Sequence, residues 1–461
     1  MMTMLTRKNF IGAMIATGTT ACTAPFASRK RWYRGMLHMH SLWSDGQVLP
    51  EQAISAYKDA GYDFVSLTDH NRFQDNPDHW LPVSKFIKTK WPARYMHEKR
   101  FEAYMKRSGQ TACLRKKGDK TEVRLRTYGE FKKMFDEPGE FLVLPGTEIT
   151  TDVFGTGSKR SMHMNIIGID SVIARAKNAR YVEKLANHTA SSAMRETYSM
   201  SERLAAERGV KKAIYMLNHP HWPACDILAE DMIATPEITG FEICNNGARF
   251  AVPPQFRDGS FSESFWDVTL AHRVANNQDL LYAFASDDTH SYPNTGLASS
   301  ALFADGYIMV KADELTQDSL FEAISRGDFY ASSELDLDDV FFDSRRGSLE
   351  VSATPKKDET LKIRFITTKK GVPINPVSHV DVKDPKNSAK CLRSIPVYDQ
   401  RVGATVKLVE GEKGTPVRAS YTLQPDDLYV RARVESDQPS KGGERICHVK
   451  THTAWTQPYR Y

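Results

Sequence analysis

Seven short apolar segments, separated by amphipathic helical segments, are the feature of this 461-residue chain that most constrains its fold. They lie at residues 34–38, 63–68, 140–145, 163–168, 212–217, 239–244 and 280–286. Pro50 to Ala60, followed by Gly61, and Ser262 to Asn276 have the composition and spacing of helices. Strands that alternate with helices favour a parallel sheet covered on both faces, and seven such units favour a closed barrel over an open sheet.

Two long stretches interrupt this alternation. Residues 78–138 are basic and aromatic, and residues 171–208 are polar and helix-prone. Both fall on strand-to-helix connections, which is the side where a parallel barrel carries its active site. Residues 84–133 hold sixteen Lys and Arg against five Asp and Glu, whereas the whole chain carries only +5. This run predicts either a solvated face or a basic arm facing an anionic substrate or membrane surface.

After residue 335 the pattern changes to a period of two. Residues 361–368, 377–382 and 429–434 alternate between apolar and polar side chains, and turn residues recur between them. This pattern predicts an antiparallel β-sandwich domain at 336–461, which follows a barrel domain at 31–335.

Residues 1–30 are predicted to be a signal peptide. Arg7 and Lys8 precede an apolar stretch that is too short to cross a membrane. Residues 6–11 resemble a twin-arginine export signal with Lys as the second basic residue, and residues 19–22 resemble a lipobox, so lipid attachment at Cys22 stays open. We expect an exported protein that is periplasmic, secreted or lipid-anchored at the cell surface.

Composition and cysteine spacing narrow the class of protein further. Hydrophobic residues make up 41% of the chain and charged residues 26%, which excludes disordered and polytopic membrane proteins. The five cysteines after Cys22 are widely spaced, without a CxxC pair. They predict buried structural thiols rather than a disulfide framework.

Histidines and acids gather at the predicted carboxyl ends of the strands. The candidate metal ligands are His38, His40, Asp45, His70, Glu148, His163, His219, Asp288 and His290. His38 and His40 are two residues apart in an extended segment, so both imidazoles point the same way. Imidazole and carboxylate ligands together suit Mn, Fe or Zn. Nine ligands are too many for one ion and predict a cluster in which a carboxylate bridges two ions.

These motifs resemble those of the PHP (polymerase and histidinol phosphatase) superfamily. They are His-Met-His at 38–40, Thr-Asp-His at 68–70, Asn-His-Pro at 218–220 and Asp-Thr-His at 288–290. Residues 37–46 and 64–71 further resemble the exported, carbaryl-hydrolase-like branch of that superfamily. The resemblance covers about residues 34–335. It implies a distorted (β/α)7 barrel with a trinuclear site for three divalent metal ions (Mn, Zn or Fe).

The resemblance also implies how the ligands divide among the ions. The groups are His38, His40, Glu148 and Asp288 for one ion; Glu148, His163 and His219 for the second; and Asp45, His70 and His290 for the third. Three divalent ions against three carboxylates leave about +3, which favours an anion such as phosphate. A metal-bound hydroxide is then the expected nucleophile, since the chain has no GxSxG signature.

Three further residues are candidates for catalysis. Asp69 could orient an imidazole or cap a helix, His221 could protonate a leaving group or be an ordinary loop histidine, and Arg249 could clamp a phosphate. Asp287 is predicted to be structural. The aromatic residues that could line the pocket are Trp43, Trp222 and Tyr292.

The leading hypothesis is a metal-dependent phosphoesterase, a phosphoric ester hydrolase that acts on a phosphodiester. A phospholipid or glycolipid headgroup is a candidate substrate, and peripheral or lipid-anchored membrane association is expected. The alternative is a carboxylic or carbamate ester hydrolase that uses the same metals. A third hypothesis is a non-catalytic surface-binding protein, against which the full ligand set argues. The chain shows no nucleic-acid recognition motif.

Overall fold

The structure is a computed structural model of the chain. It describes residues 30–85, 94–107, 112–154, 159–170, 188–222, 225, 227–247, 260–297, 303–356, 358–384, 387–441 and 449–461. The predicted export signal, Cys22 and Arg249 lie outside these residues.

The larger sheet has nine strands in the order β20-β17-β22-β23-β14-β13-β1-β2-β7. Their bounds are β1 (Arg31–Met36), β2 (Phe64–Ser66), β7 (Leu142–Leu144), β13 (Gly306–Ala312), β14 (Phe329–Ser333), β17 (Leu361–Thr367), β20 (Ala404–Glu410), β22 (Arg431–Pro439) and β23 (Thr451–Thr456). β1, β2 and β7 are parallel, whereas β13 and every strand beyond it pair antiparallel.

The second sheet has five strands in the order β12-β11-β10-β9-β8. Their bounds are β8 (Gly146–Phe154), β9 (Lys159–Ile167), β10 (Ile214–Leu217), β11 (Gly240–Asn245) and β12 (Tyr282–Ser286). β10, β11 and β12 are parallel, while β8 and β9 form an antiparallel hairpin and β9 pairs antiparallel with β10. All seven predicted strands are therefore present, whereas β8 was not predicted.

The two sheets do not close into the predicted (β/α)7 barrel, so that prediction is corrected to a mixed α/β fold with several sheets. The β8–β9 hairpin interrupts the parallel order on one side, and β13 pairs with β1 and β14 rather than with β12 on the other. Among the described residues, strand pairing between the two sheets is limited to two isolated bridges, Met39 with Thr289 and His70 with Glu148.

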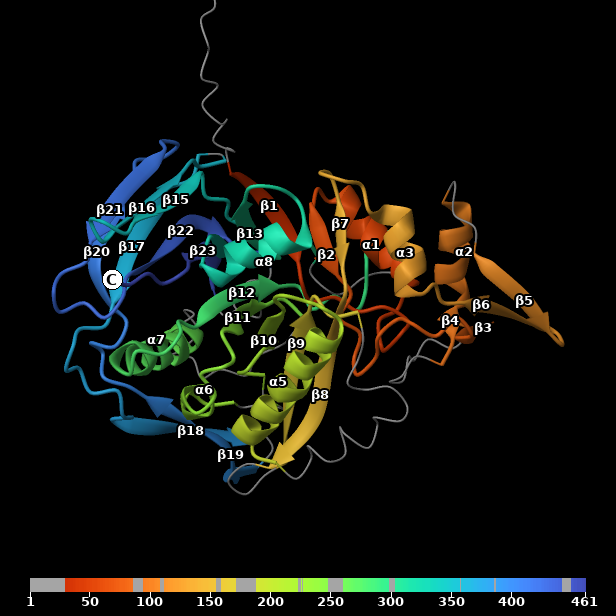
Figure 1. The fold of residues 1–461 in the computed structure, drawn as a ribbon, viewed down its shortest axis with the longest axis horizontal. Coiled ribbons are helices and arrows are strands. Elements are labelled where there is room, and N and C mark those ends of the chain that lie inside the picture. The colour runs from red at the N-terminus through yellow and green to blue at the C-terminus, as the bar shows by residue number, and fades with distance from the viewer. Residues whose placement is uncertain are drawn as a thin grey trace, which may run out of the picture.

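Helices lie along the five-stranded sheet and along β1, β2 and β7 of the larger sheet (Figure 1). Their bounds are α1 (Pro50–Asp59), α2 (Glu98–Lys106), α3 (Tyr128–Phe135), α5 (Ala190–Glu207), α6 (Ala229–Ile233), α7 (Ser260–Ala275) and α8 (Gln317–Ser325). α1 begins at Pro50, and Gly61 just beyond its end has a φ of +81° that favours glycine. α5, α6 and α7 pack on the five-stranded sheet, and α1 and α3 pack on β1, β2 and β7.

The insertion between β2 and β7 forms a small sheet of its own, in the order β4-β3-β6-β5. Its strands are β3 (Trp80–Ser84), β4 (Met96–His97), β5 (Cys113–Lys117) and β6 (Lys120–Arg124). The β5–β6 hairpin projects from one end of the molecule (Figure 1). Its basic side chains are largely exposed.

The strands after residue 336 pair antiparallel, as their alternating sequence predicts. β15 (Asp339–Asp343), β16 (Ser348–Ala353) and β21 (Val417–Thr422) form a layer that shares one apolar core with β17 and β22. β18 (Ser378–Asp384) and β19 (Asn387–Val397) form a separate hairpin. Because β23 pairs with β14, the larger sheet continues across residue 335.

Cys244 is disulfide-bonded, whereas Cys113 and Cys225 have free thiols. The prediction of buried thiols is thus right for Cys225, which is buried, and wrong for Cys244. Within the described ranges, no helix is long and apolar enough to cross a membrane.

Candidate metal centre

The nine predicted ligands meet at the seam between the two sheets. His38, His40 and Asp45 follow β1, His70 follows β2, His219 follows β10, Asp288 and His290 follow β12, Glu148 lies on β8 and His163 lies on β9. The isolated bridges between the sheets involve His70, Glu148 and the neighbours of His38 and Asp288. The site therefore depends on strand ends that come together from distant parts of the sequence.

Four buried ligand atoms at the centre have no hydrogen-bond partner. They are Nε2 of His38, Nε2 of His40, Oε2 of Glu148 and Oδ1 of Asp288. Nε2 of His40 lies 3.0 Å from Asp288 Oδ1 and 3.4 Å from Glu148 Oε2. Nε2 of His38 lies 3.3 and 3.4 Å from the same two oxygens. Ligands about 2.1 Å from one tetrahedral ion lie about 3.4 Å apart, so this donor set fits a divalent cation.

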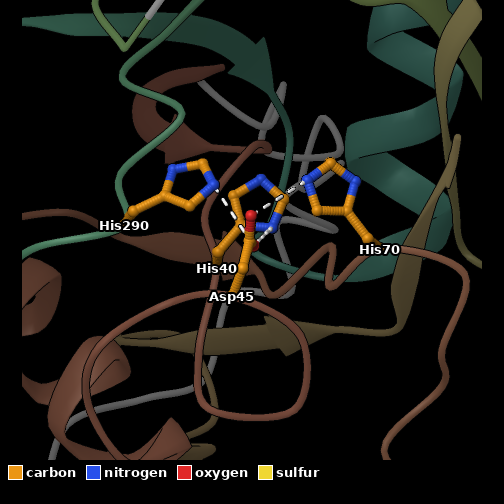
Figure 2. A group of neighbouring side chains, drawn as sticks. All are labelled: His40, Asp45, His70 and His290. Carbon is orange, nitrogen blue, oxygen red and sulfur yellow. Dashed lines mark ion pairs between the residues drawn. The ribbon is translucent and has the colours of Figure 1, made fainter. Parts of the chain in front are cut away.

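A second group lies on the more accessible side of the centre. His40, His70 and His290 surround Asp45, and their rings point toward its carboxylate (Figure 2). Asp45 Oδ1 is 3.2 Å from His290 Nε2, and Oδ2 is 3.7 Å from His70 Nε2. The side chains of Asp45 and His290 are 26% and 33% exposed. This group is therefore the most exposed part of the centre.

A third group surrounds the other face of Glu148. Oε1 of Glu148 is 2.9 Å from His163 Nδ1 and 3.7 Å from His219 Nε2. The indole of Trp222 lies edge-on to both imidazoles, at centroid distances of 5.7 and 5.5 Å. Glu148 therefore contacts histidines of several groups, as a bridging carboxylate would.

The backbone is strained at two of the predicted ligands. His219 has a φ of 25° and Asp288 a φ of 49°, a region that non-glycine residues rarely adopt. Asn71, beside His70, has a φ of 50°. Such residues cluster at functional sites, where the surrounding structure holds them in place.

The electrostatics keep the carboxylates ionised. Although burial opposes it, the neighbouring imidazoles hold the pKa values of Glu148 and Asp288 well below their ordinary range. Burial lowers the pKa of His163 to about 4 despite Glu148. Against burial, Asp45 raises the pKa of His290 to about 9. Carboxylates held deprotonated are the form that binds divalent cations.

Asp69 holds the loop that carries Asp45 through the hydrogen bonds of its carboxylate, and its role in orienting an imidazole stays a prediction. Its Oδ1 accepts the backbone N–H groups of Ser41 and Ser44, at 2.9 and 3.1 Å, and its Oδ2 accepts the hydroxyl of Ser41 and the amide of Gln74. It is fully buried. A buried carboxylate that accepts this many hydrogen bonds from one loop fixes the conformation of that loop.

Replacing Asp69 with asparagine is expected to lower both metal content and turnover, the latter by about 10- to 100-fold, because Asp45 loses its support. Metal analysis and initial rates measure both effects. Asp63→Asn is the matched control, since Asp63 accepts the backbone N–H of Arg34 at the opposite end of the same strands. An Asp69→Asn protein with wild-type metal content would contradict this role.

Of the other two predicted catalytic residues, the structure describes only His221. His221 is buried, and its ring lies edge-on to Phe265 of α7 at 4.9 Å. Its role as an acid stays a prediction, as does that of Arg249. Asp287 is structural, as predicted, because it accepts hydrogen bonds from Tyr57, Asn246 and the backbone of residues 304–306.

Of the three aromatic candidates, only Trp222 packs its ring against the imidazoles of predicted ligands. Trp43 is buried and donates its indole N–H to the carbonyl of Arg126. Tyr292 is buried and donates its hydroxyl to the carbonyl of His40. Trp43 and Tyr292 therefore hold the loops of the centre through buried hydrogen bonds.

Sequence reasoning missed Glu242 and Asn218. Glu242 lies on β11 with its Oε1 2.7 Å from His38 Nδ1, and Asn218 donates to Glu148 Oε1 at 2.9 Å. The available signal was a single charged residue inside the apolar segment 239–244. A buried carboxylate in such a segment requires hydrogen-bond donors, and the local sequence does not show which residues supply them.

No protein-family model matches the chain, and no curated protein matches it. Among solved structures, it is similar to a two-domain protein from Bacteroides vulgatus described as containing a predicted PHP-like metal-dependent phosphoesterase. That match has 16% identity and a TM-score of 0.37, and covers 91% of this chain and 94% of that one.

Two further solved structures are similar over less of the chain. One is described as a candidate metal-dependent phosphoesterase from Bifidobacterium adolescentis, with 14% identity, a TM-score of 0.29 and coverage of 63% of this chain and 96% of that one. The other is an amidohydrolase from Chromobacterium violaceum with bound sulfate and no metal, with 13% identity, a TM-score of 0.25 and coverage of 57% and 90%.

Proposed function

We propose that the protein is a metal-dependent phosphoesterase that hydrolyses a phosphodiester. The observation that carries this proposal is the set of four buried, unpartnered ligand atoms at the seam of the sheets, within contact distance of one another. The likeness of the sequence motifs to the PHP superfamily supports it. Histidine and carboxylate donors in this number suit a cluster of divalent ions rather than a single one.

Three groups of residues would hold the ions. They are His38, His40, Glu148 and Asp288; Glu148, His163 and His219; and Asp45, His70 and His290. Divalent Mn, Zn or Fe bound there would supply positive charge for a phosphate and would acidify a water molecule to serve as the nucleophile. The chain contributes the fixed geometry, with Glu148 between the groups.

The residues on the open side determine how substrate reaches the centre. Asp45 and His290 are partly exposed, so the phosphate group is expected to enter past them. Glu148 is fully buried and cannot move toward solvent without losing its contacts. The buried ligands therefore form a rigid base, and the exposed ones form the entrance.

The competing function is hydrolysis of a carboxylic or carbamate ester at the same centre. It is favoured by Trp222, whose indole borders His163 and His219 and offers an aromatic wall to a neutral substrate. The charge around the ligands favours it as well: in the part of the chain that the structure describes, no Lys or Arg is ion-paired with Asp45, Glu148 or Asp288.

The test is a panel of p-nitrophenyl substrates offered to Mn²⁺-loaded protein: a phosphodiester, a phosphomonoester, an acetate and an N-methylcarbamate. We expect diester turnover that EDTA abolishes and that Mn²⁺ restores, because the proposed nucleophile is a water molecule that the metal ions would acidify. Turnover of acetate or carbamate without diester turnover would establish the competing function. Diester turnover that survives complete removal of metal would contradict the proposal.

The proposal includes export and action near a membrane surface. The N-terminal basic and apolar pattern supports export, and the disulfide at Cys244 is consistent with an oxidising compartment. The exposed basic β5–β6 hairpin supports attraction to anionic headgroups, which makes lipid phosphodiesters candidate substrates.

A further inference from the structure

We propose that Glu242 is a positioning residue that presents His38 and His219 to a metal ion; this inference rests on the metal centre proposed above. Glu242 lies on β11 and is 1% exposed. It belongs to none of the ligand groups. Its carboxylate acts through the residues that it holds.

All four acceptor positions of Glu242 receive donors from the chain. Oε1 lies 2.7 Å from His38 Nδ1 and accepts the hydroxyl of Ser286 at 2.5 Å. Oε2 accepts the backbone N–H of His219 at 2.7 Å and the side-chain amide of Asn245 at 2.8 Å. With these four partners, Glu242 has no lone pair left for an ion of its own.

The contact with His38 decides which imidazole nitrogen faces the centre. A carboxylate at 2.7 Å from Nδ1 holds a proton on that nitrogen, which leaves Nε2 as the lone-pair donor. Nε2 is the atom that lies 3.3 Å from Asp288 Oδ1 and 3.4 Å from Glu148 Oε2. Glu242 thus fixes both the tautomer and the ring orientation of His38.

The contact with His219 holds a strained backbone. The φ of His219 is 25°, and its N–H is satisfied by Glu242 rather than by a strand neighbour. Asn245, which also donates to Glu242, reaches Asp288 Oδ2 at 3.4 Å. One carboxylate therefore joins the turns that follow β10 and β12.

An ordinary packing role does not explain a carboxylate at this position. Burying an ionised carboxylate costs several kcal/mol unless donors converge on it, and an apolar side chain would fill the same space at less cost. The donors that converge here come from the turns and strand ends that carry His38, His219 and Asp288.

The experiment compares metal binding by wild-type protein and Glu242→Gln. Metal-free protein is titrated with Mn²⁺ against a chelating dye, and the absorption spectrum of the Co²⁺ form is recorded. We expect Glu242→Gln to bind about 10- to 100-fold more weakly, with an altered Co²⁺ spectrum, because an amide places a donor against the donors of His219 and Asn245 or of His38 and Ser286.

The matched control is Glu51→Gln. Glu51 is also 1% exposed and accepts hydrogen bonds from Tyr104 and Arg126, away from the ligands. We expect its metal affinity and Co²⁺ spectrum to match those of the wild type, even if its stability falls. A role of Glu242 in stability alone would make the two variants alike.

Wild-type affinity and spectrum in folded Glu242→Gln would overturn the proposal. If that variant does not fold, Glu242→Asp decides, since it keeps the charge but withdraws it by one methylene. Affinity at least about 5-fold below wild type then supports the positioning role, and unchanged affinity overturns it. Failure of the wild-type protein itself to bind metal would instead refute the proposed metal centre.

Discussion

Replacement of Glu148 by glutamine is expected to lower turnover at least about 1,000-fold and to lower the metal content, while the fold is kept. A factor of 1,000 corresponds to about 4 kcal/mol of transition-state stabilisation, which is the scale on which bound metal ions act. The substitution keeps the size of the side chain and removes only its charge and one acceptor.

Glu148 is the residue whose loss affects the most ligands at once. It is fully buried. Its carboxylate lies within 2.9 to 3.7 Å of imidazole nitrogens of His38, His40, His70, His163 and His219. An amide cannot bridge two cations as a carboxylate can, because only one of its two terminal atoms carries lone pairs suited to a metal.

Metal analysis of the purified variant, with initial rates on the best substrate, measures the effect. Asp152→Asn is the control, because Asp152 lies four residues further along β8 and belongs to no ligand group. We expect that control to keep its metal and its turnover. Wild-type activity in Glu148→Gln would exclude Glu148 as a bridging ligand and would remove the basis for the proposed function.

The convergence of the nine ligand-type side chains could be predicted from the sequence because each follows or lies in a recognisable apolar segment. His38 and His40 share a face of an extended chain, and Asp288 and His290 follow the last such segment. Strand ends of parallel units meet at one edge whether or not the sheet closes. The prediction that these side chains converge therefore did not depend on the incorrect prediction of a closed barrel.

The pairing of β8 with β9 could not be predicted in the same way. Residues 146–154 are rich in Thr and polar side chains, so they lack the apolar run that marked the other strands. Their pairing with β9 places Glu148 opposite Asn165 and Thr150 opposite His163. Strand partners are chosen by tertiary contacts, which a local pattern does not contain.

The supporting residues were hidden for a related reason. Asp69 contacts a loop 28 positions earlier in the chain, and Glu242 contacts His38 across 204 positions. Neither separation along the sequence produces a spacing pattern that could be recognised. A buried charge in an apolar strand indicates that partners exist, but only the fold identifies them.

Replacing Arg431 by methionine is expected to lower the free energy of unfolding by about 3–5 kcal/mol. The Arg431 side chain is fully buried between the larger sheet and α7. It donates to both oxygens of Asp267, at 2.8 and 2.6 Å, and to Glu263 at 2.8 Å. Tyr429 also donates to Asp267 at 2.7 Å. These acids raise the pKa of Arg431 further, against the effect of burial, so it stays charged.

The cost arises from what the substitution leaves behind. Burial alone would raise the pKa of Glu263, yet Arg433 and Arg431 hold it below its ordinary value. Without Arg431, the buried carboxylate of Asp267 loses its cationic partner. Either Asp267 takes up a proton, or the contact between α7 and β22 breaks. Urea unfolding followed by tryptophan fluorescence measures the change, with Trp266 and Trp455 beside the cluster as reporters.

Arg364→Met is the control for loss of an arginine on the same sheet. Arg364 pairs with Glu435 of the neighbouring strand at 2.6 Å, but its side chain is 36% exposed, so solvent can replace the partner. We expect that substitution to cost less than about 1 kcal/mol. Equal and small effects of both substitutions would show that solvent reaches Asp267 and Glu263. A large effect of Arg431→Met alone would show that α7, which packs behind the site-bearing sheet, is fixed to the strands beyond residue 335 by buried charge.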